Sequence, residues 1–249
     1  MVNTRILKSE PVLIIEGHKR YMVITDLHIG FEDEFISNKI EIGKNSSINE
    51  TINKLKKLIL LEKPESIILL GDVKSSLKRI SNTEWQDVPY FFNEIKKHTN
   101  VILVPGNHDA SIQQLVPNDI TITNTIGFVI DDVLLTHGHT LPTENFANIK
   151  KIIMGHIHPV FFDENSLLNG KRVWISLKTK KEQIFPSSSG ELEITVVPSF
   201  NPYFYATKKR FYKKSISPII GKLKEITEAR IVTLDGAIIG NESILDDLI

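Results

Sequence analysis

Short apolar runs, each followed by a cluster of polar residues, dominate the first 110 residues of the chain. The runs cover residues 11–15, 21–25, 66–70 and 101–104. Each is too short for a typical helix and is bounded by turn residues, so each predicts a strand. Between them, apolar residues recur at steps of three and four, which predicts a helix from Ser47 to just before Pro64 and another across 85–95. Ser47 and Glu50 have the S-x-x-E form of a capping box, which predicts a cap at the start of the first helix. Strands that alternate with helices favour βαβ units and a largely parallel sheet.

The second half of the chain has a different pattern. Further strands are predicted at 126–130, 133–136, 152–154, 172–177, 192–197, 230–234 and 237–239. Helical periodicity is scarce after Lys151, and no linker separates the two halves. We therefore expect an α/β (α+β) fold in which a second sheet packs on the first, within a single domain that spans residues 1–249.

Composition narrows the functional classes. The 249 residues include 41% hydrophobic and 24% charged residues, which is enough apolar material for a large core. Thirty basic residues balance thirty acidic ones, so the formal net charge is zero and argues against attraction of the whole chain to nucleic acid. A local basic patch that binds nucleic acid is not excluded. The absence of cysteine excludes disulfides, thiolate metal sites and cysteine nucleophiles. No apolar run is long enough to span a membrane and the first residues lack a signal-peptide pattern, so we expect a cytoplasmic protein.

Polar side chains with metal-binding chemistry follow the predicted strands. They are Asp26, His28, Asp72, Asn107, His137, His156 and His158. The carboxyl ends of strands in α/β sheets are where ligands bind. This mixture of oxygen and nitrogen donors suits Mn²⁺, Fe or Zn²⁺ better than Mg²⁺ or Ca²⁺. Seven ligands are too many for one tetrahedral ion and suit two ions that share a carboxylate.

The order and spacing of these residues resemble those of a known family. D-x-H at Asp26, G-D at Asp72, G-N-H-D at 106–109, H-G-H at His137 and G-H-x-H at 155–158 occur in sequence. Together they resemble the calcineurin-like metallophosphoesterases, and the stretch 197–203 is similar to the small archaeal phosphoesterases related to the SbcD nuclease.

The resemblance implies a fold, a reaction and a set of roles. The fold would be a four-layer αββα sandwich of two mixed sheets. The reaction would be hydrolysis of a phosphodiester or phosphomonoester by a metal-bound hydroxide, with two divalent ions, Mn²⁺ being favoured and Fe or Zn²⁺ the alternatives. Asp26, His28 and His158 would hold the first ion, Asn107, His137 and His156 the second, and Asp72 would bridge them. His108 would contact the phosphate together with Asn107 and protonate the leaving oxygen, with Asp109 orienting its ring.

The sequence departs from the family pattern after Asp72. The usual acidic or histidine residue is replaced by the run Val73-Lys74-Ser75-Ser76. Lys74 is a candidate contact for substrate phosphate, or an ordinary solvated lysine. His139 is a candidate to contact His137 from the side away from the metal. We expect the acidic cluster 32–34 to be solvated surface.

Several functional alternatives stay open. Aromatic and basic residues interleave across 200–214, a pattern that can stack bases and bind phosphates but also occurs on solvated edges. The substrate is therefore a nucleic acid, a nucleotide or another small phosphate ester. A non-catalytic adaptor that retains the fold is the alternative from a different class. No feature of the sequence indicates an oligomeric state.

Overall fold

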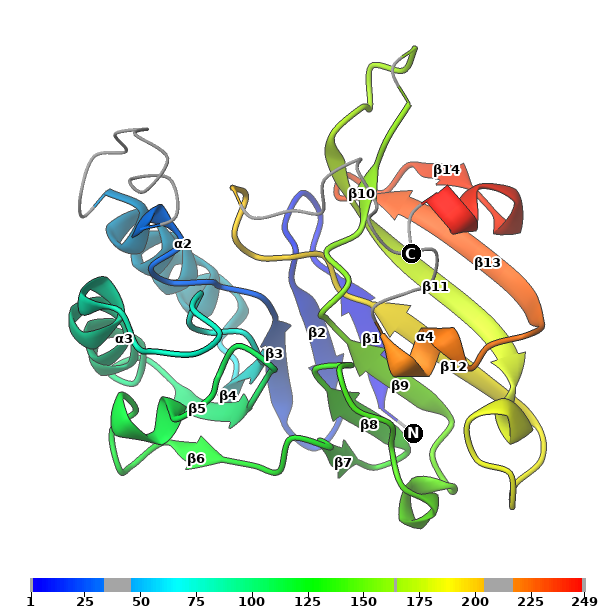
Figure 1. The fold of residues 1–249 in the computed structure, drawn as a ribbon, viewed down its shortest axis with the longest axis horizontal. Coiled ribbons are helices and arrows are strands. Elements are labelled where there is room, and N and C mark those ends of the chain that lie inside the picture. Colours follow the sequence, from blue (N-terminus) through cyan, green and yellow to red (C-terminus); the bar gives the residue numbers. More distant parts are fainter. Residues whose placement is uncertain (1, 34–45, 164, 204–216, 248–249) are drawn as a thin grey trace.

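The structure is a computed structural model of the chain, and it describes residues 2–33, 46–163, 165–203 and 217–247. Most of the basic and aromatic stretch at 200–214, and Glu34 of the acidic cluster, lie outside these residues. Two sheets pack face to face, with long helices on the outer face of the first (Figure 1).

The first sheet has six strands in the described residues, in the order of the chain. They are β1 (Asn3–Ile6), β2 (Leu13–Glu16), β3 (Arg20–Ile24), β4 (Ser66–Leu70), β5 (Asn100–Val104) and β6 (Thr121–Ile122). The strands β1 to β3 are antiparallel neighbours, whereas β3, β4, β5 and β6 run parallel. The predicted strands and the parallel core of this sheet are confirmed, and β1 and β6 were not predicted.

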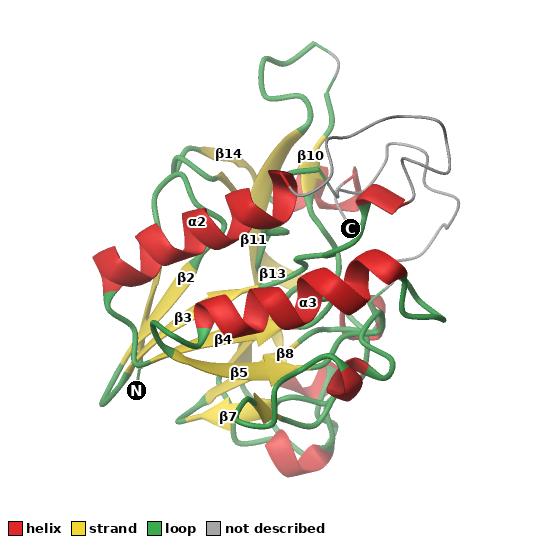
Figure 2. Ribbon diagram, turned by 90° about the vertical axis from the view of Figure 1, so that its left-hand side faces the viewer, coloured by secondary structure: helices red, strands yellow, loops and turns green. Residues whose placement is uncertain are grey.

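Two helices cover one face of this sheet, as Figure 2 shows from that side. They are α2 (Ser46–Glu62) and α3 (Asn82–Ile95). The apolar stripe of α2, which includes Ile48, Ile52, Leu55 and Ile59, is buried in the same core as Ile67 and other residues of the sheet. The 3.6-residue periodicity predicted this helix and its buried side correctly.

The second sheet has eight strands in the described part of the chain. They are β7 (Phe128–Ile130), β8 (Val133–Thr136), β9 (Lys151–Met154), β10 (Val160–Phe161), β11 (Lys171–Lys180), β12 (Glu191–Val196), β13 (Ile226–Thr233) and β14 (Ile238–Gly240). The strands β8, β9 and β12 are parallel neighbours and the remaining pairings are antiparallel. The sheet is therefore mixed, like the first.

Alternation along the strands explains why the sheets pack against each other. On β4, Ile67 and Leu69 face the helices, while Ile68 and Leu70 face the second sheet. Trp174 of β11 lies in this inter-sheet core and is fully buried. Both faces of β4 are thus covered, which is why it is a continuous apolar run in the sequence.

Short helical turns cover the outer face of the second sheet. The helix α4 (Pro218–Gly221) buries Ile219 and Ile220 against it, and Phe185 and Leu245 lie in the same cluster. The 3₁₀ turns of the described chain are Ile112–Gln114, Glu144–Phe146, Lys181–Gln183 and Glu242–Asp247. The layered α/β architecture with two mixed sheets is confirmed. No helix among the described residues is long and apolar enough to cross a membrane.

Candidate metal centre

The predicted ligands lie at the carboxyl ends of parallel strands in both sheets. Asp26 and His28 follow β3, Asp72 follows β4, and Asn107 follows β5, all in the first sheet. His137 follows β8, and the pair His156 and His158 follows β9, in the second. Because the sheets face each other, the two rims meet: the Nε2 atom of His137 is 3.2 Å from Oδ2 of Asp72, and that of His158 is 3.0 Å from Oδ1 of Asp26.

Unusual backbone conformations aim these side chains. Asp26, His28, Asp72, His156 and His158 all have φ between 45° and 73°, in the left-handed region that non-glycine residues rarely adopt. Such conformations cost about 1–3 kcal/mol each and concentrate at functional sites. Left-handed turns directly after the strands therefore bring the two residues of each i, i+2 pair close together. These pairs are Asp26 with His28 and His156 with His158.

Gly106, which precedes Asn107, allows a close approach between two of these turns. A Cβ atom at this position would lie 2.2 Å from Oδ1 of Asp72 and 2.4 Å from its backbone nitrogen. Any larger residue would displace Asp72. The glycine of the G-N-H-D motif is therefore needed for packing against the central carboxylate.

The residues form two groups that share Asp72. The first comprises Asp26, His28, Asp72 and His158, and the second Asp72, His137 and His156, with one potential ligand atom of each residue within 4.8 Å of the others in its group. In the first group the Nε2 atoms of His28 and His158 are 3.3 Å apart. In the second, Oδ1 of Asn107 is 3.2 Å from Nε2 of His137. Ligands about 2.1 Å from a tetrahedral or octahedral ion lie roughly 3.0–3.4 Å apart, so these spacings fit bound cations.

Asp72 faces both groups through one oxygen. Its Oδ2 is 3.2 Å from Nε2 of His137 and 3.9 Å from Nε2 of His28. Its Oδ1 instead accepts a hydrogen bond of 2.8 Å from the backbone N–H of His108. Oδ2 is thus the oxygen of Asp72 that faces histidines of both groups.

Surrounding groups fix the orientation of the ligands. The hydroxyl hydrogen of Thr25 is shared by two acceptors, which are Oδ2 of Asp26 at 2.9 Å and the main-chain carbonyl of Leu70 at 2.8 Å. The backbone N–H of His156 is 3.2 Å from the same Oδ2. His137 donates from Nδ1 to the carbonyl of Leu70 at 2.6 Å, which leaves its Nε2 for a cation. Such outer contacts set the tautomer and direction of metal ligands.

The electrostatics of the cluster favour cation binding. Burial alone would raise the pKa of Asp26 and Asp72, but the neighbouring histidines outweigh it and hold both values below the ordinary range. Burial would lower the pKa of His137, yet the charge of Asp72 raises it to about 9. Burial and the charge of His158 lower the pKa of His28 to about 3. Asp26 and Asp72 thus stay ionised, and their negative charges attract cations to the cluster.

His108 lies beside the cluster but is oriented differently from the prediction. Its Nε2 is 3.9 Å from Oδ2 of Asp72, and its Nδ1 donates to the main-chain carbonyl of Ser75. Asp109 does not take this role: its carboxylate accepts backbone N–H bonds from Val73, Lys74 and Gly106 at 2.9, 3.3 and 2.8 Å. Burial, reinforced by the charge of Asp72, raises the pKa of Asp109 to about 6. Adjacent residues of a tight turn point in different directions, so Asp109 joins two loops rather than orienting the ring.

Lys74 is also placed differently from the sequence-based expectation. Its side chain is fully buried, and its ammonium group donates to the main-chain carbonyl of Ser76. Contact with a substrate phosphate would require the group to leave this position. Lys74 is therefore not among the proposed substrate contacts.

His139 lies behind the cluster. Its ring centroid is 5.2 Å from that of His137, and burial together with the charge of His137 lowers its pKa to about 4. Its ring thus contacts that of His137, one of the predicted ligands.

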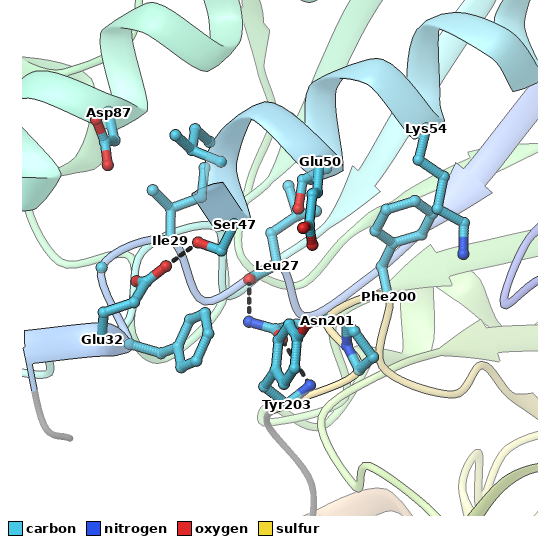
Figure 3. A pocket seen from close by; sticks show the side chains of 15 residues that line it. Leu27, Ile29, Glu32, Ser47, Glu50, Lys54, Asp87, Phe200, Asn201 and Tyr203 are labelled. Carbon is cyan, nitrogen blue, oxygen red and sulfur yellow. Dashed lines mark hydrogen bonds between the residues drawn. The ribbon is translucent and has the colours of Figure 1, made fainter. Parts of the chain in front are cut away.

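A separate pocket, with about 580 Å³ of empty space including its open mouth, borders the segment that carries Asp26 and His28 (Figure 3). It lies between this segment, the start of α2 and residues 200–203, and none of the seven predicted ligands lines it. The rings of Phe31 and Tyr203 stack on its wall, 5.7 Å apart. Carboxylates of Glu32 and Asp87 also line it, and burial raises the pKa of both.

The pocket corrects two sequence-based expectations. Glu32 is not solvated surface but a pocket residue, and its carboxylate accepts a hydrogen bond from the hydroxyl of Ser47. Ser47 therefore does not cap α2, which already begins at Ser46. No local sequence pattern predicts this pocket, because its walls come from four segments that are distant in the sequence.

Comparisons with known proteins agree with the fold. A search of curated proteins found no match. The nuclease MPE of Pseudomonas putida is similar in structure, with a TM-score of 0.57 and 15% sequence identity, covering 94% of this chain and 98% of that one. YfcE, a phosphoesterase of E. coli, aligns with a TM-score of 0.40 and 15% identity over 90% of this chain and 98% of its own.

The family comparison covers the motifs directly. The family model described as "Calcineurin-like phosphoesterase" matches residues 19–184, which is about two thirds of the chain. All seven predicted ligands, His108 and Asp109 fall inside this range. The chain belongs to the calcineurin-like phosphoesterase family.

Proposed function

We propose that the protein is a two-metal phosphoesterase that hydrolyses a phosphodiester. The observation that supports this most strongly is the pair of potential ligand groups that share Asp72, with His108 beside them. Within the family, we place the chain with the small archaeal phosphoesterases related to SbcD, on the sequence of residues 197–203.

Each group would hold one ion. Asp26, His28, Asp72 and His158 would bind the first, and Asp72, Asn107, His137 and His156 the second. The mixture of imidazole, amide and carboxylate favours Mn²⁺, with Fe or Zn²⁺ as alternatives. When bound, two such ions activate water and neutralise phosphate charge.

The residues of the chain supply binding and proton transfer. Carboxamide and imidazole groups of Asn107 and His108 sit next to the shared carboxylate, where they can bind a phosphate oxygen. Since Nδ1 of His108 donates to Ser75, its Nε2 is the nitrogen that faces the site. In the doubly protonated ring, the proton on Nε2 would pass to the ester oxygen as its bond to phosphorus breaks, so the leaving group departs as an alcohol and the ring keeps its proton on Nδ1.

Hydrolysis of bis(p-nitrophenyl) phosphate tests this function. We expect turnover that requires added Mn²⁺, stops with chelator and is lost in Asp72→Asn. Asp119→Asn is a matched control, because Asp119 pairs with Lys96 on the surface, away from the site. Absence of turnover in a folded, metal-loaded protein across phosphate diesters and monoesters would contradict the proposal and favour the non-catalytic adaptor.

Binding of single-stranded DNA distinguishes the substrate classes. A nuclease neutralises several phosphates, so its affinity would fall steeply with salt. The P. putida nuclease is a reason to include this assay, although at 15% identity it is similar in fold alone. Salt-dependent binding and cleavage would assign a nucleic acid, whereas their absence with intact diesterase activity would assign a small ester.

A further inference from the structure

Among the described residues, no carboxylate holds Nδ1 of the His108 imidazole, the nitrogen that faces away from Asp72. Catalytic histidines are commonly held by a carboxylate on the nitrogen that faces away from the reaction. Here that nitrogen, Nδ1, donates to the main-chain carbonyl of Ser75. The loop 73–76 that carries this carbonyl is the segment in which the sequence departs from the family pattern.

A buried carboxylate holds the other side of the same peptide unit. Glu84 is fully buried on the first turn of α3, and its Oε1 accepts the backbone N–H of Ser76 at 2.7 Å and that of Ser75 at 2.9 Å. Its Oε2 accepts from the hydroxyl of Ser76 and from the backbone N–H of Ser81. The N–H of Ser76 and the carbonyl of Ser75 belong to one trans peptide group. The carboxylate, this peptide group and the imidazole therefore form a continuous chain of hydrogen bonds.

The side chain of Glu84 is closely packed between two loops that contact each other. A Cβ atom on Gly30, the glycine two residues after His28, would lie 2.8 Å from Cγ of Glu84. Ser75 also donates its N–H to the carbonyl of Ile29 at 3.0 Å. Because Gly30 has no side chain, Glu84 fits at the point where the His28 segment, the 73–76 loop and α3 meet.

We propose that Glu84 is the positioning residue for His108 and acts through the Ser75–Ser76 peptide group. Hydrogen bonds in such a chain polarise one another, so an acceptor at the N–H end strengthens the carbonyl as an acceptor for Nδ1–H. This keeps one proton on Nδ1 and directs Nε2, the nitrogen that gives up its proton in the doubly protonated ring, toward Asp72. The inference rests on the proposed function for its catalytic consequence, but the orientation of the ring can be measured without activity.

Glu84→Gln is the test variant because it keeps the shape and replaces one acceptor oxygen by an NH₂ donor that faces other donors. Ser81→Ala is the matched control. It removes the other half of the α3 capping box, in which Ser81 Oγ accepts the N–H of Glu84 at 3.2 Å, and leaves the contacts of Glu84 to the loop intact. Should Glu84→Gln fail to fold by circular dichroism, Glu84→Asp, which withdraws the carboxylate by one methylene, takes its place.

The kinetic readout compares two diesters. Proton donation matters for a phenol leaving group and much less for p-nitrophenol. We expect Glu84→Gln to lower kcat roughly tenfold for the diphenyl ester and less than about threefold for the bis(p-nitrophenyl) ester, a part of the roughly 10²- to 10⁴-fold that acid–base catalysis supplies. Ser81→Ala should change both equally. Equal effects of Glu84→Gln on both esters would overturn the proposal.

The second readout is long-range ¹H–¹⁵N NMR of the imidazoles in the Zn²⁺-loaded protein, with the His108 signal assigned by His108→Asn. For the neutral ring, we expect a single Nδ1–H tautomer in the wild type and in Ser81→Ala, and a mixture of tautomers in Glu84→Gln. An unchanged signal in Glu84→Gln would refute the positioning role. A wild type that hydrolyses neither ester would refute the proposed function, while the NMR result still decides the role of Glu84.

Discussion

Substitution of Thr25 tests how far the metal ligands depend on their surroundings. Thr25 is 1% exposed and its hydroxyl contacts Oδ2 of Asp26 at 2.9 Å. This oxygen has the Thr25 hydroxyl and the N–H of His156 as partners, while Oδ1 faces His158 and the predicted cation. Thr25→Val keeps the volume and removes the hydroxyl, so the carboxylate loses one of the two contacts that hold it in place.

The magnitude follows from this one contact. A hydrogen bond to a charged group contributes about 1.5–3 kcal/mol. At about 1.4 kcal/mol per factor of ten, its loss should weaken binding of the ion held by Asp26 roughly 10- to 100-fold. Thr25→Ser, which retains the hydroxyl, should stay within about threefold of the wild type by the same reasoning.

Calorimetric titration of metal-stripped protein with Mn²⁺ measures the effect. One of the two sites should weaken in Thr25→Val and recover in Thr25→Ser. Wild-type affinity in Thr25→Val, or an equal loss in both variants, would show that the hydroxyl does not hold the ligand and would refute the reasoning.

Further predictions concern the shared carboxylate. Gly106→Ala brings a Cβ atom within 2.2 Å of Oδ1 of Asp72; a ligand displaced by about 1 Å should lower kcat for the nitrophenyl diester roughly 10²-fold, and near-wild-type turnover would contradict the close packing. In metal-free protein, the pKa of His137 is raised from 6.5 to about 9 because Asp72 outweighs burial. The folded state then holds the extra proton, so the free energy of unfolding should fall as pH rises from about 6.5 to 9. Calorimetric melting should show this slope in the wild type and a flatter one in Asp72→Asn; the same slope in both would reject the pairing. Saturating Zn²⁺ binds the neutral ring and should reduce or reverse the slope.

The clustering of the predicted ligands could be anticipated from the sequence because its signals are local. Each ligand directly follows an apolar run, and parallel strands end at the same rim, so strand prediction alone brings Asp26, Asp72 and Asn107 together. The meeting of the second rim with the first, through His137 and His158, came from the order of the motifs rather than from periodicity.

Residues that act through tertiary contacts were harder to predict. The pattern S-x-x-E occurs at both Ser47 and Ser81. The first occurrence predicts a cap at Ser47, whereas the complete capping box forms at the second, where Glu84 also reaches the 73–76 loop. Nothing local distinguishes the two, because the difference lies in which distant backbone groups face the glutamate. The direction of Asp109 escaped prediction for the same reason.

Counting bound ions tests the central claim most directly. Metal-stripped wild type and Asp72→Asn would be saturated with Mn²⁺, freed of excess ion and analysed by elemental mass spectrometry alongside turnover of the nitrophenyl diester. We predict two ions per chain with turnover in the wild type, and at most one ion without turnover in Asp72→Asn. Full turnover with a single ion per chain, or two ions retained in an active Asp72→Asn, would contradict a centre built on a shared carboxylate.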